Sequence, residues 1–305
     1  MRKLLILPAL FACSAVVAAP LCQVVAPADA PPLVRQAAQE LSAYLSRWGE
    51  SAVPWTTAAR PYLPAIRLLL VPQESAYGEE GYAISSVGKG SALQVTIAAR
   101  TPLGILHGAY RLLREYGFGF YFDGDAVPPR PPRTLATATV QAEPVFAIRG
   151  SLPWYNFLNS PTTWDDQDFR FFADQIIRSG QNFIGFHAYD FEPFAAYEYE
   201  GRVLGGETLQ TTEGSVWGTS PLAVDDFGFG SGRLFPGRFW GSDVARQPGS
   251  REDRIAAQKA LLARGLAYAS ARGVKTCLGF EVHGDPTDPQ EQRRFRALFL
   301  HLLRD

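Results

Sequence analysis

Two expected strand ends within residues 143–192 carry side chains that suit a polyhydroxylated ligand. Arg149 follows the apolar run Val145–Ile148, and His187 and Asp190 follow a second apolar run over 182–186. A guanidinium group offers several fixed N–H donors for neighbouring hydroxyl groups, and imidazole and carboxylate groups complete the hydrogen bonds. The alternative for Arg149 is a structural pair with a carboxylate, and for His187 a satisfied structural histidine. The functional interpretation predicts a sugar-binding site.

Aromatic and acidic residues extend this candidate site. Trp154, Tyr155 and Asn156 follow the first strand, where aromatic rings would either stack on the C–H face of a sugar or plug the end of a barrel. Glu281 and His283 stand at the end of a third apolar run. Hydrolysis of a sugar linkage needs two appropriately placed carboxyl groups, or one with substrate assistance. No such pair can be assigned from the sequence, so the catalytic residues stay unknown. The expected substrate-binding residues are Arg149, Trp154, Tyr155, Asn156, His187, Tyr189, Asp190, Glu281 and His283.

Helical and strand patterns place these residues at one edge of a parallel sheet. A helix is expected to begin at Thr163 or Asp165 and to end at Gly180, because four apolar residues recur between them at helical spacing. A helix between two buried strands forms a right-handed crossover that makes the strands parallel. Ligands bind at the carboxyl ends of such strands, so the candidate residues would meet there.

The same alternation continues along the chain. A helix is predicted over Asp253–Ala271, a strand over Val274–Val282 and a helix over Asp288–Leu303. Segment 193–250 lacks a strong period, but its aromatic content favours ordered packing. We expect a hairpin around Glu200–Gly201 and a long loop that forms one wall of the binding cleft.

Residues 20–142 are predicted to form a separate small α+β domain. An amphipathic helix over Leu33–Trp48 buries one apolar face, and a second helix begins at a Thr101 cap and runs through Glu115. Stretch Val127–Arg133 holds four prolines and is expected to be a semi-rigid linker at the domain boundary. Four strands are expected, at Ile66–Val71, Tyr82–Val87, Leu93–Ala98 and Phe118–Phe122.

The barrel motifs carry a family resemblance. Arg149-Gly150 and the pattern Asn182-x4-His187-x2-Asp190 resemble the first two barrel strands of family 20 glycoside hydrolases. Ala271–Val274, followed by Glu281, resembles their third strand. The resemblance implies that Arg149 binds ring hydroxyls of an oligosaccharide or polysaccharide substrate.

A second, separate match lies in the small domain. Gly104–Leu113 is similar to the second helix of the domain that precedes the barrel in the same hydrolases. Families 67 and 84 share this plan, so the resemblance is to the clan, and a hexosaminidase-like and an α-glucuronidase-like activity both stay open. It implies that the acid pair lies at the end of a fourth barrel strand.

The expected fold class is therefore α/β: a small α+β N-terminal domain (20–142) followed by an incomplete TIM (β/α)8 barrel (143–305). A complete barrel needs about 250 residues, whereas about three βα units are expected here. We expect a fragment of a glycoside hydrolase, inactive alone because the acid pair is missing. One alternative is a non-catalytic carbohydrate-binding or scaffold module. Another is an exported α/β protein whose similarity is architectural only.

Composition and the N-terminal residues indicate which partners and which compartment suit the protein. The net charge of −1, with 19% charged residues, gives no basic face for nucleic acid. Residues 1–19 have a basic start, an apolar middle and a small-residue cleavage site, which predicts a signal peptide and export to the periplasm or the outside. Lipoprotein anchoring at Cys13 is a minor alternative. No later stretch predicts a transmembrane segment, and the oligomeric state is left open.

Two cysteines would remain after cleavage. Cys22 and Cys277 could pair in an oxidising compartment, but the apolar run around Cys277 favours a buried free thiol. No metal-ligand spacing occurs in the sequence, and no cofactor is implied.

Overall fold

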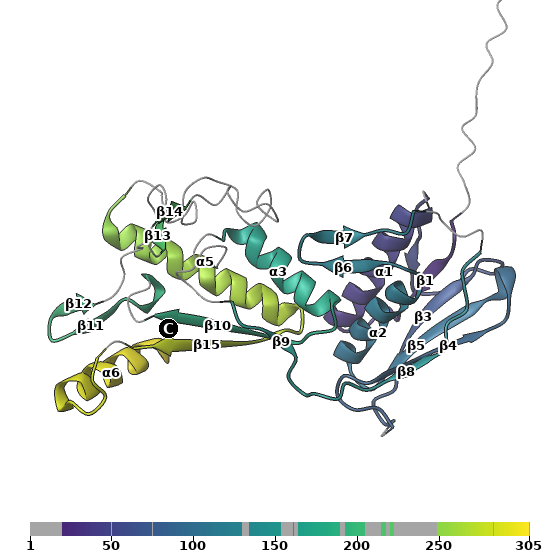
Figure 1. Ribbon diagram of the computed structural model, residues 1–305. Coiled ribbons are helices and arrows are strands. Elements are labelled where there is room, and N and C mark those ends of the chain that lie inside the picture. Colours follow the sequence, from purple (N-terminus) through teal and green to yellow (C-terminus); the bar gives the residue numbers. More distant parts are fainter. Residues whose placement is uncertain are drawn as a thin grey trace, which may run out of the picture.

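A computed structural model shows the protein as two lobes joined side by side (Figure 1). It describes residues 20–49, 51–74, 76–129, 134–153, 161, 164–189, 193–204, 215–217, 220–222, 249–282 and 284–304. Helices α1 and α2 of one lobe face helices α3 and α5 of the other across the junction (Figure 1).

The first lobe is built on a six-stranded mixed sheet with the order β2-β1-β3-β5-β4-β8. Strands β2, β1, β3 and β5 run parallel to one another, whereas β4 pairs antiparallel with both β5 and β8. Two helices, α1 and α2, pack against each other on one side of the sheet (Figure 1). The bounds are β1 Gln23–Val25, α1 Pro32–Gly49, β2 Trp55–Thr56, β3 Ala65–Leu70, β4 Tyr82–Val87, β5 Gln94–Ala99, α2 Pro102–Glu115 and β8 Val140–Ala142.

Local signals place the two helices as predicted. In α1 the buried residues Val34, Leu41, Tyr44 and Trp48 lie on the expected apolar face. Thr101 caps α2, since its hydroxyl accepts a hydrogen bond from the Gly104 N–H at 3.1 Å. These two helices supply most of the core between the sheet and the second lobe.

The proline-rich stretch does not mark the domain boundary. After it, β8 returns to the small sheet and pairs with β4, with Tyr82 opposite Ala142 and Ile84 opposite Val140. The prediction of a boundary linker at Val127–Arg133 is therefore wrong, because one more strand of the small domain follows it. The short hairpin of β6 (Gly119–Tyr121) and β7 (Gly124–Ala126) precedes the prolines.

The second lobe contains three βα units in chain order. Its parallel sheet has the order β15-β10-β9, and helices connect each strand to the next. This is the expected α/β arrangement of an incomplete (β/α)8 barrel, with α3 and α5 on one face of the sheet (Figure 1). The bounds are β9 Gly150–Ser151, α3 Asp166–Arg178, β10 Phe183–Tyr189, α5 Arg251–Ala271, β15 Lys275–Glu281 and α6 Pro289–Leu302.

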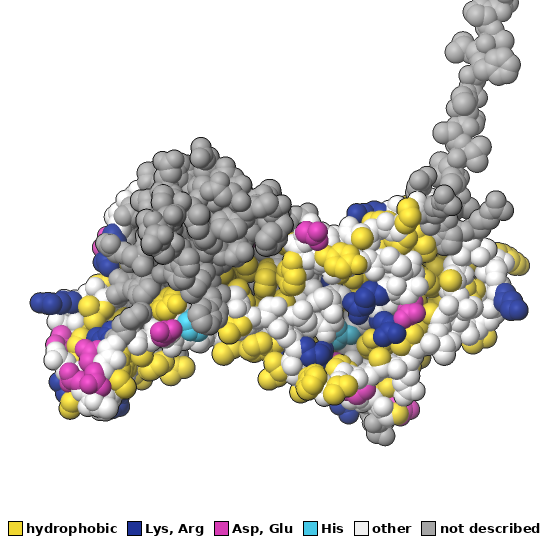
Figure 2. Space-filling view, in the orientation of Figure 1, with side chains coloured by type: hydrophobic (Ala, Val, Ile, Leu, Met, Phe, Trp, Pro, Cys, Tyr) yellow, Lys and Arg dark blue, Asp and Glu magenta, His cyan; other side chains and the backbone are white. Residues whose placement is uncertain are grey.

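The first barrel strand begins later than predicted. Val145–Ile148 is not a strand, and Val145, Phe146 and Ile148 are exposed. Pairing with β10 starts at Gly150 and extends to the hydrogen bond from the His187 N–H to the Pro153 carbonyl at 3.1 Å. Figure 2 shows hydrophobic side chains along the lower edge of the molecule, where the chain runs from β8 to β9 in Figure 1. Apolar composition alone did not identify the strand, because the partner strand sets the register.

Segment 193–250 is described only in part. The predicted hairpin is confirmed: β11 (Tyr197–Tyr199) and β12 (Arg202–Leu204) pair around Glu200 and Gly201, whose φ angles are 49° and 73°. The short helix η3 (Pro193–Ala195) precedes it, and β13 (Ser215–Trp217) pairs with β14 (Ser220–Leu222). The remainder of the predicted cleft wall lies outside the described residues.

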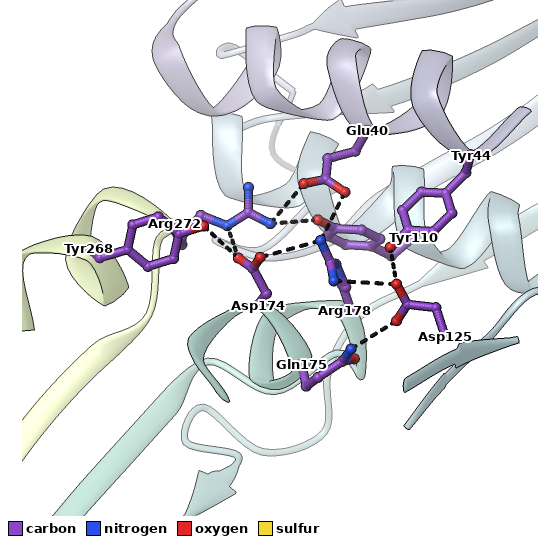
Figure 3. A network of polar contacts seen from close by, with 9 residues as sticks. All are labelled: Glu40, Tyr44, Tyr110, Asp125, Asp174, Gln175, Arg178, Tyr268 and Arg272. Carbon is purple, nitrogen blue, oxygen red and sulfur yellow. Dashed lines mark hydrogen bonds and ion pairs between the residues drawn. The ribbon is translucent and has the colours of Figure 1, made fainter. Parts of the chain in front are cut away.

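A network of buried charges joins the two lobes (Figure 3). Arg178 of α3 contacts Glu40 of α1 at 3.4 Å, Asp125 of β7 at 3.4 Å and Asp174 at 3.3 Å. Arg272, at the end of α5, contacts Glu40 at 3.0 Å and Asp174 at 2.7 Å. Burial raises the pKa of Asp174, against the opposing effect of the two guanidinium groups. The network is completed by Tyr44, Tyr110, Gln175 and Tyr268.

Candidate functional site

The carboxyl ends of β10 and β15 bring three predicted site residues together. Ile184, Phe186 and Ala188 are buried, so the alternating residues of β10, among them His187 and Tyr189, lie on the opposite face of the sheet. Tyr189 is paired in register with Glu281 of β15, which places that carboxylate on the same face. Strand β10 is longer than predicted, so His187 and Tyr189 are part of the strand and do not follow it.

The three side chains form a compact polar group. His187 Nε2 lies 3.6 Å from Glu281 Oε2, and the rings of His187 and Tyr189 meet edge to face at 5.5 Å between centroids. The His187 side chain is 21% exposed and the Glu281 side chain 57% exposed, so both reach solvent. An imidazole, a phenol and a carboxylate together provide donors and acceptors suited to hydroxyl groups.

Glycine leaves open space beside this group. Gly279 is the register partner of His187 on β15. Among the described residues, a Cβ atom added there would meet only the Phe186 carbonyl oxygen, at 3.7 Å, so no described side chain occupies the space above this part of the backbone. A flat ring can therefore approach the sheet next to the imidazole, in the way that glycine permits close approach of a ligand.

Five of the nine predicted binding residues lie outside the described residues: Trp154, Tyr155, Asn156, Asp190 and His283. Their predicted roles stay predictions. Among the residues that the structure describes, no group of three or more His, Cys, Asp or Glu side chains is arranged to hold a metal ion.

Arg149 lies at the opposite end of the sheet from His187. It precedes β9, and its carbonyl oxygen accepts from the Asn182 N–H at 2.8 Å, before the first residue of β10. Its guanidinium group is engaged throughout: Nη2 pairs with Glu80, Nε donates to the Gly180 carbonyl at 3.0 Å and Nη1 donates to the Phe146 carbonyl at 2.6 Å. The predicted position at the carboxyl end of the first strand is wrong, and the contacts are those of the structural alternative.

Glu80 is the centre of this second cluster. It is 5% exposed, and the Asn182 amide donates to it at 2.5 Å, while His107 Nε2 lies 3.2 Å away. Burial favours the neutral carboxyl, but the side chains of His107, Arg149 and Asn182 outweigh it and lower the pKa of Glu80 to about 2. Glu80 therefore stays ionised and ties the small domain to the first strands of the second lobe.

Sequence reasoning missed Glu80 as the partner of Arg149, and His107 as a second partner of Glu80. A usable signal was present, because His107 is a polar residue on the buried side of α2 and therefore requires a partner. Asn182, which the sequence motif places at the start of the second strand, is fully buried and also donates to the Ala147 carbonyl at 2.8 Å. Its role in the described structure is to align the two strand starts.

The two described cysteines, Cys22 and Cys277, are unpaired. Cys22 is buried in the small domain, whereas Cys277 of β15 is exposed. The expectation of a buried thiol at Cys277 is wrong, because the first three residues of β15 are all exposed, and β15 is the end strand of the described sheet. In the described part of the chain, no helix is long and apolar enough to cross a membrane.

Comparison with known proteins finds likeness in fold alone. No protein-family model and no curated protein that was compared matches the chain. It is similar to a variant β-hexosaminidase of Streptomyces plicatus in complex with its product GlcNAc, with 18% identity and a TM-score of 0.49 over 86% of this chain and 42% of that one. It is also similar to a family 138 glycoside hydrolase targeting pectin rhamnogalacturonan II, with 15% identity and a TM-score of 0.49 over 85% of this chain and 31% of that one.

A third similar structure is a family 20 exo-β-N-acetylglucosaminidase of Vibrio harveyi, with 12% identity and a TM-score of 0.44. It is matched over 85% of this chain and 32% of its own length. All three are glycoside hydrolases. The chain spans less than half the length of each, so the activity of the whole enzymes is not transferred to it.

Proposed function

We propose that this chain provides part of the sugar-binding cleft of an exported glycoside hydrolase of the hexosaminidase or α-glucuronidase type. The observation that carries the proposal is the convergence of His187, Tyr189 and Glu281 on one open face, at the carboxyl ends of two parallel strands. Ligands of α/β barrels bind at this edge. The sequence motif that contains His187 supports the same ligand class.

The roles of the three residues follow from their chemistry. Glu281 accepts hydrogen bonds from sugar hydroxyls, His187 donates or accepts depending on its tautomer, and Tyr189 limits the pocket beside them. Arg149 has no part in the proposal, because its donors are engaged at the other end of the sheet.

We further propose that the acid pair is not supplied by these 305 residues. Glycoside hydrolysis uses two carboxyl groups flanking the scissile bond, or one with substrate assistance. Glu281 lies 3.6 Å from His187 at this edge. The resemblance of the sequence motifs implies an acid pair at the end of a fourth barrel strand, beyond the three strands of the described sheet β15-β10-β9. The second candidate function is a non-catalytic carbohydrate-binding module that uses the same face.

Titration calorimetry with N-acetylglucosamine and with glucuronic acid tests the cleft. We expect one of the two sugars to bind, and Glu281→Gln to weaken that binding about tenfold, because a charged acceptor is lost. Glu115→Gln is the matched control: it makes the same change in an exposed pair with Arg111 on α2. Unchanged affinity in Glu281→Gln, or no binding of either sugar, would refute the cleft.

Turnover tests whether the acid pair is missing from this chain. The purified chain is expected not to hydrolyse 4-nitrophenyl N-acetyl-β-glucosaminide or 4-nitrophenyl α-glucuronide. Hydrolysis that is lost in Glu281→Gln would show that the acids are present in this chain. Export is tested by sequencing the N-terminus of the protein recovered from the periplasm or medium, which we expect to begin near Pro20.

A further inference from the structure

The loop between β2 and β3 displays an aromatic ring at an unfavourable backbone position. Tyr62 has a φ of 65°, in the left-handed region that favours glycine, and its side chain is 90% exposed. Neither feature contributes to folding, since the ring buries little surface and the backbone is strained. Such outliers concentrate where a ligand is bound.

The small domain holds this loop firmly. Gln23 of β1 is fully buried, and its amide donates to the carbonyl oxygens of Arg60 at 2.8 Å and Leu63 at 3.0 Å. The Arg60 N–H donates in turn to the Gln23 side chain at 2.7 Å. Pro61 and Pro64 restrict the backbone on either side of Tyr62. The ring is therefore presented by a fixed loop, which lowers the entropy cost of binding.

A pocket of about 250 Å³ lies against this loop. It is formed where the segments preceding β3 and β5 meet, because Ala65 and Gln94 are register partners. The polar side chains in its lining are Arg60, Ser91 and Gln94, together with the Tyr62 hydroxyl. No acidic residue is among the lining residues that the structure describes, so Arg60 leaves the pocket with a positive charge.

We propose that this pocket is a second carbohydrate-binding site, which holds one ring of an acidic oligosaccharide. The Tyr62 ring would stack on the C–H face of the sugar, as aromatic rings do in ligand sites that combine apolar area with a few polar groups. Ser91 and Gln94 would bind hydroxyls, and the Arg60 guanidinium would pair with a carboxylate of the sugar. The site lies on the small domain and does not depend on the cleft at β10 and β15.

Tetragalacturonate and the neutral cellotetraose are suitable probes, with binding measured by titration calorimetry and by saturation-transfer NMR on the whole chain. We expect tetragalacturonate to bind more tightly than cellotetraose, and Arg60→Gln to remove most of that difference. Tyr62→Gly should weaken binding about tenfold, whereas Tyr62→Phe should retain it. Tyr121→Ala, which removes another exposed ring on β6, is the control and should bind as the unmodified chain does.

The melting temperature distinguishes a ligand-binding role of Tyr62 from a structural one. Glycine tolerates the positive φ, so Tyr62→Gly should keep or raise the melting temperature while it loses binding. His187→Gln, in the proposed cleft, should leave this binding unchanged, which separates failure of one site from failure of the other. The proposal is overturned if neither probe binds the unmodified chain, or if Tyr62→Gly binds tetragalacturonate as well as the Tyr121→Ala control does.

Discussion

Replacing Glu80 by glutamine removes one buried negative charge and keeps the shape of the side chain. Glu80 is 5% exposed and is surrounded by Arg149, Asn182 and His107. These three neighbours stabilise an ionised side chain at this position. A neutral amide would leave the Arg149 guanidinium without its carboxylate. We therefore expect Glu80→Gln to destabilise the junction between the two lobes.

The magnitude follows from the pKa of Glu80, which falls from an ordinary 4.5 to about 2 in the folded protein. At about 1.4 kcal/mol for each tenfold change, this difference corresponds to about 3 kcal/mol at pH 7. The same size is typical when one partner of a buried pair is removed, about 3–5 kcal/mol. The side chain is almost fully buried, so screening by solvent does not reduce this value substantially.

The stabilisation that Glu80 contributes decreases as the pH falls. Because the folded-state pKa of Glu80 is depressed, its stabilisation is present in full above the unfolded pKa of 4.5 and is lost as the pH falls towards about 2. About half of the 3 kcal/mol should remain at pH 3. The gap in unfolding free energy between the unmodified protein and Glu80→Gln should therefore narrow as the solution is acidified.

Urea unfolding at pH 7, 5 and 3 measures this gap directly. Glu115→Gln is the control, because Glu115 makes an exposed ion pair with Arg111 at 2.7 Å and should contribute less than about 1 kcal/mol. The reasoning is refuted if Glu80→Gln is no less stable than Glu115→Gln at pH 7. It is also refuted if the gap does not shrink between pH 5 and pH 3.

Three further predictions concern the thiols, a helix cap and the interlobe network. Cys277 is exposed and should react with a thiol reagent in the folded protein. Cys22 should react only after unfolding, because burial raises the pKa of its thiol to about 12. Equal reaction rates of the two thiols would contradict this prediction. Thr101→Ala should cost about 1 kcal/mol of unfolding free energy through loss of the α2 cap, whereas Thr101→Ser should retain most of it. Arg178→Met should cost about 3 kcal/mol, because Glu40, Asp125 and Asp174 would lose a shared cation; urea midpoints that match the unmodified protein would count against the network.

Elements encoded by neighbouring residues could be predicted from the sequence. The apolar face of α1 follows from its 3.6-residue period, and the Thr101 cap from the geometry of a helix start. The hairpin at Glu200–Gly201 follows from Gly201, which tolerates a positive φ. The alternation of helices with buried strands indicated the parallel sheet of the second lobe. For the helix face, the cap and the hairpin, the determining interaction spans only a few residues.

The tertiary structure decided the features that depend on distant partners. Val145–Ile148 has strand-like composition, yet the register of β10 begins the strand at Gly150 and leaves the run exposed. Arg149 has the chemistry of a sugar ligand, yet Glu80, 69 residues away, takes up its guanidinium group. The sequence determines the chemical type of each side chain. Whether the donors of that side chain are free depends on the groups that lie beside it in the folded chain. Long-range packing and strand register determine which groups those are.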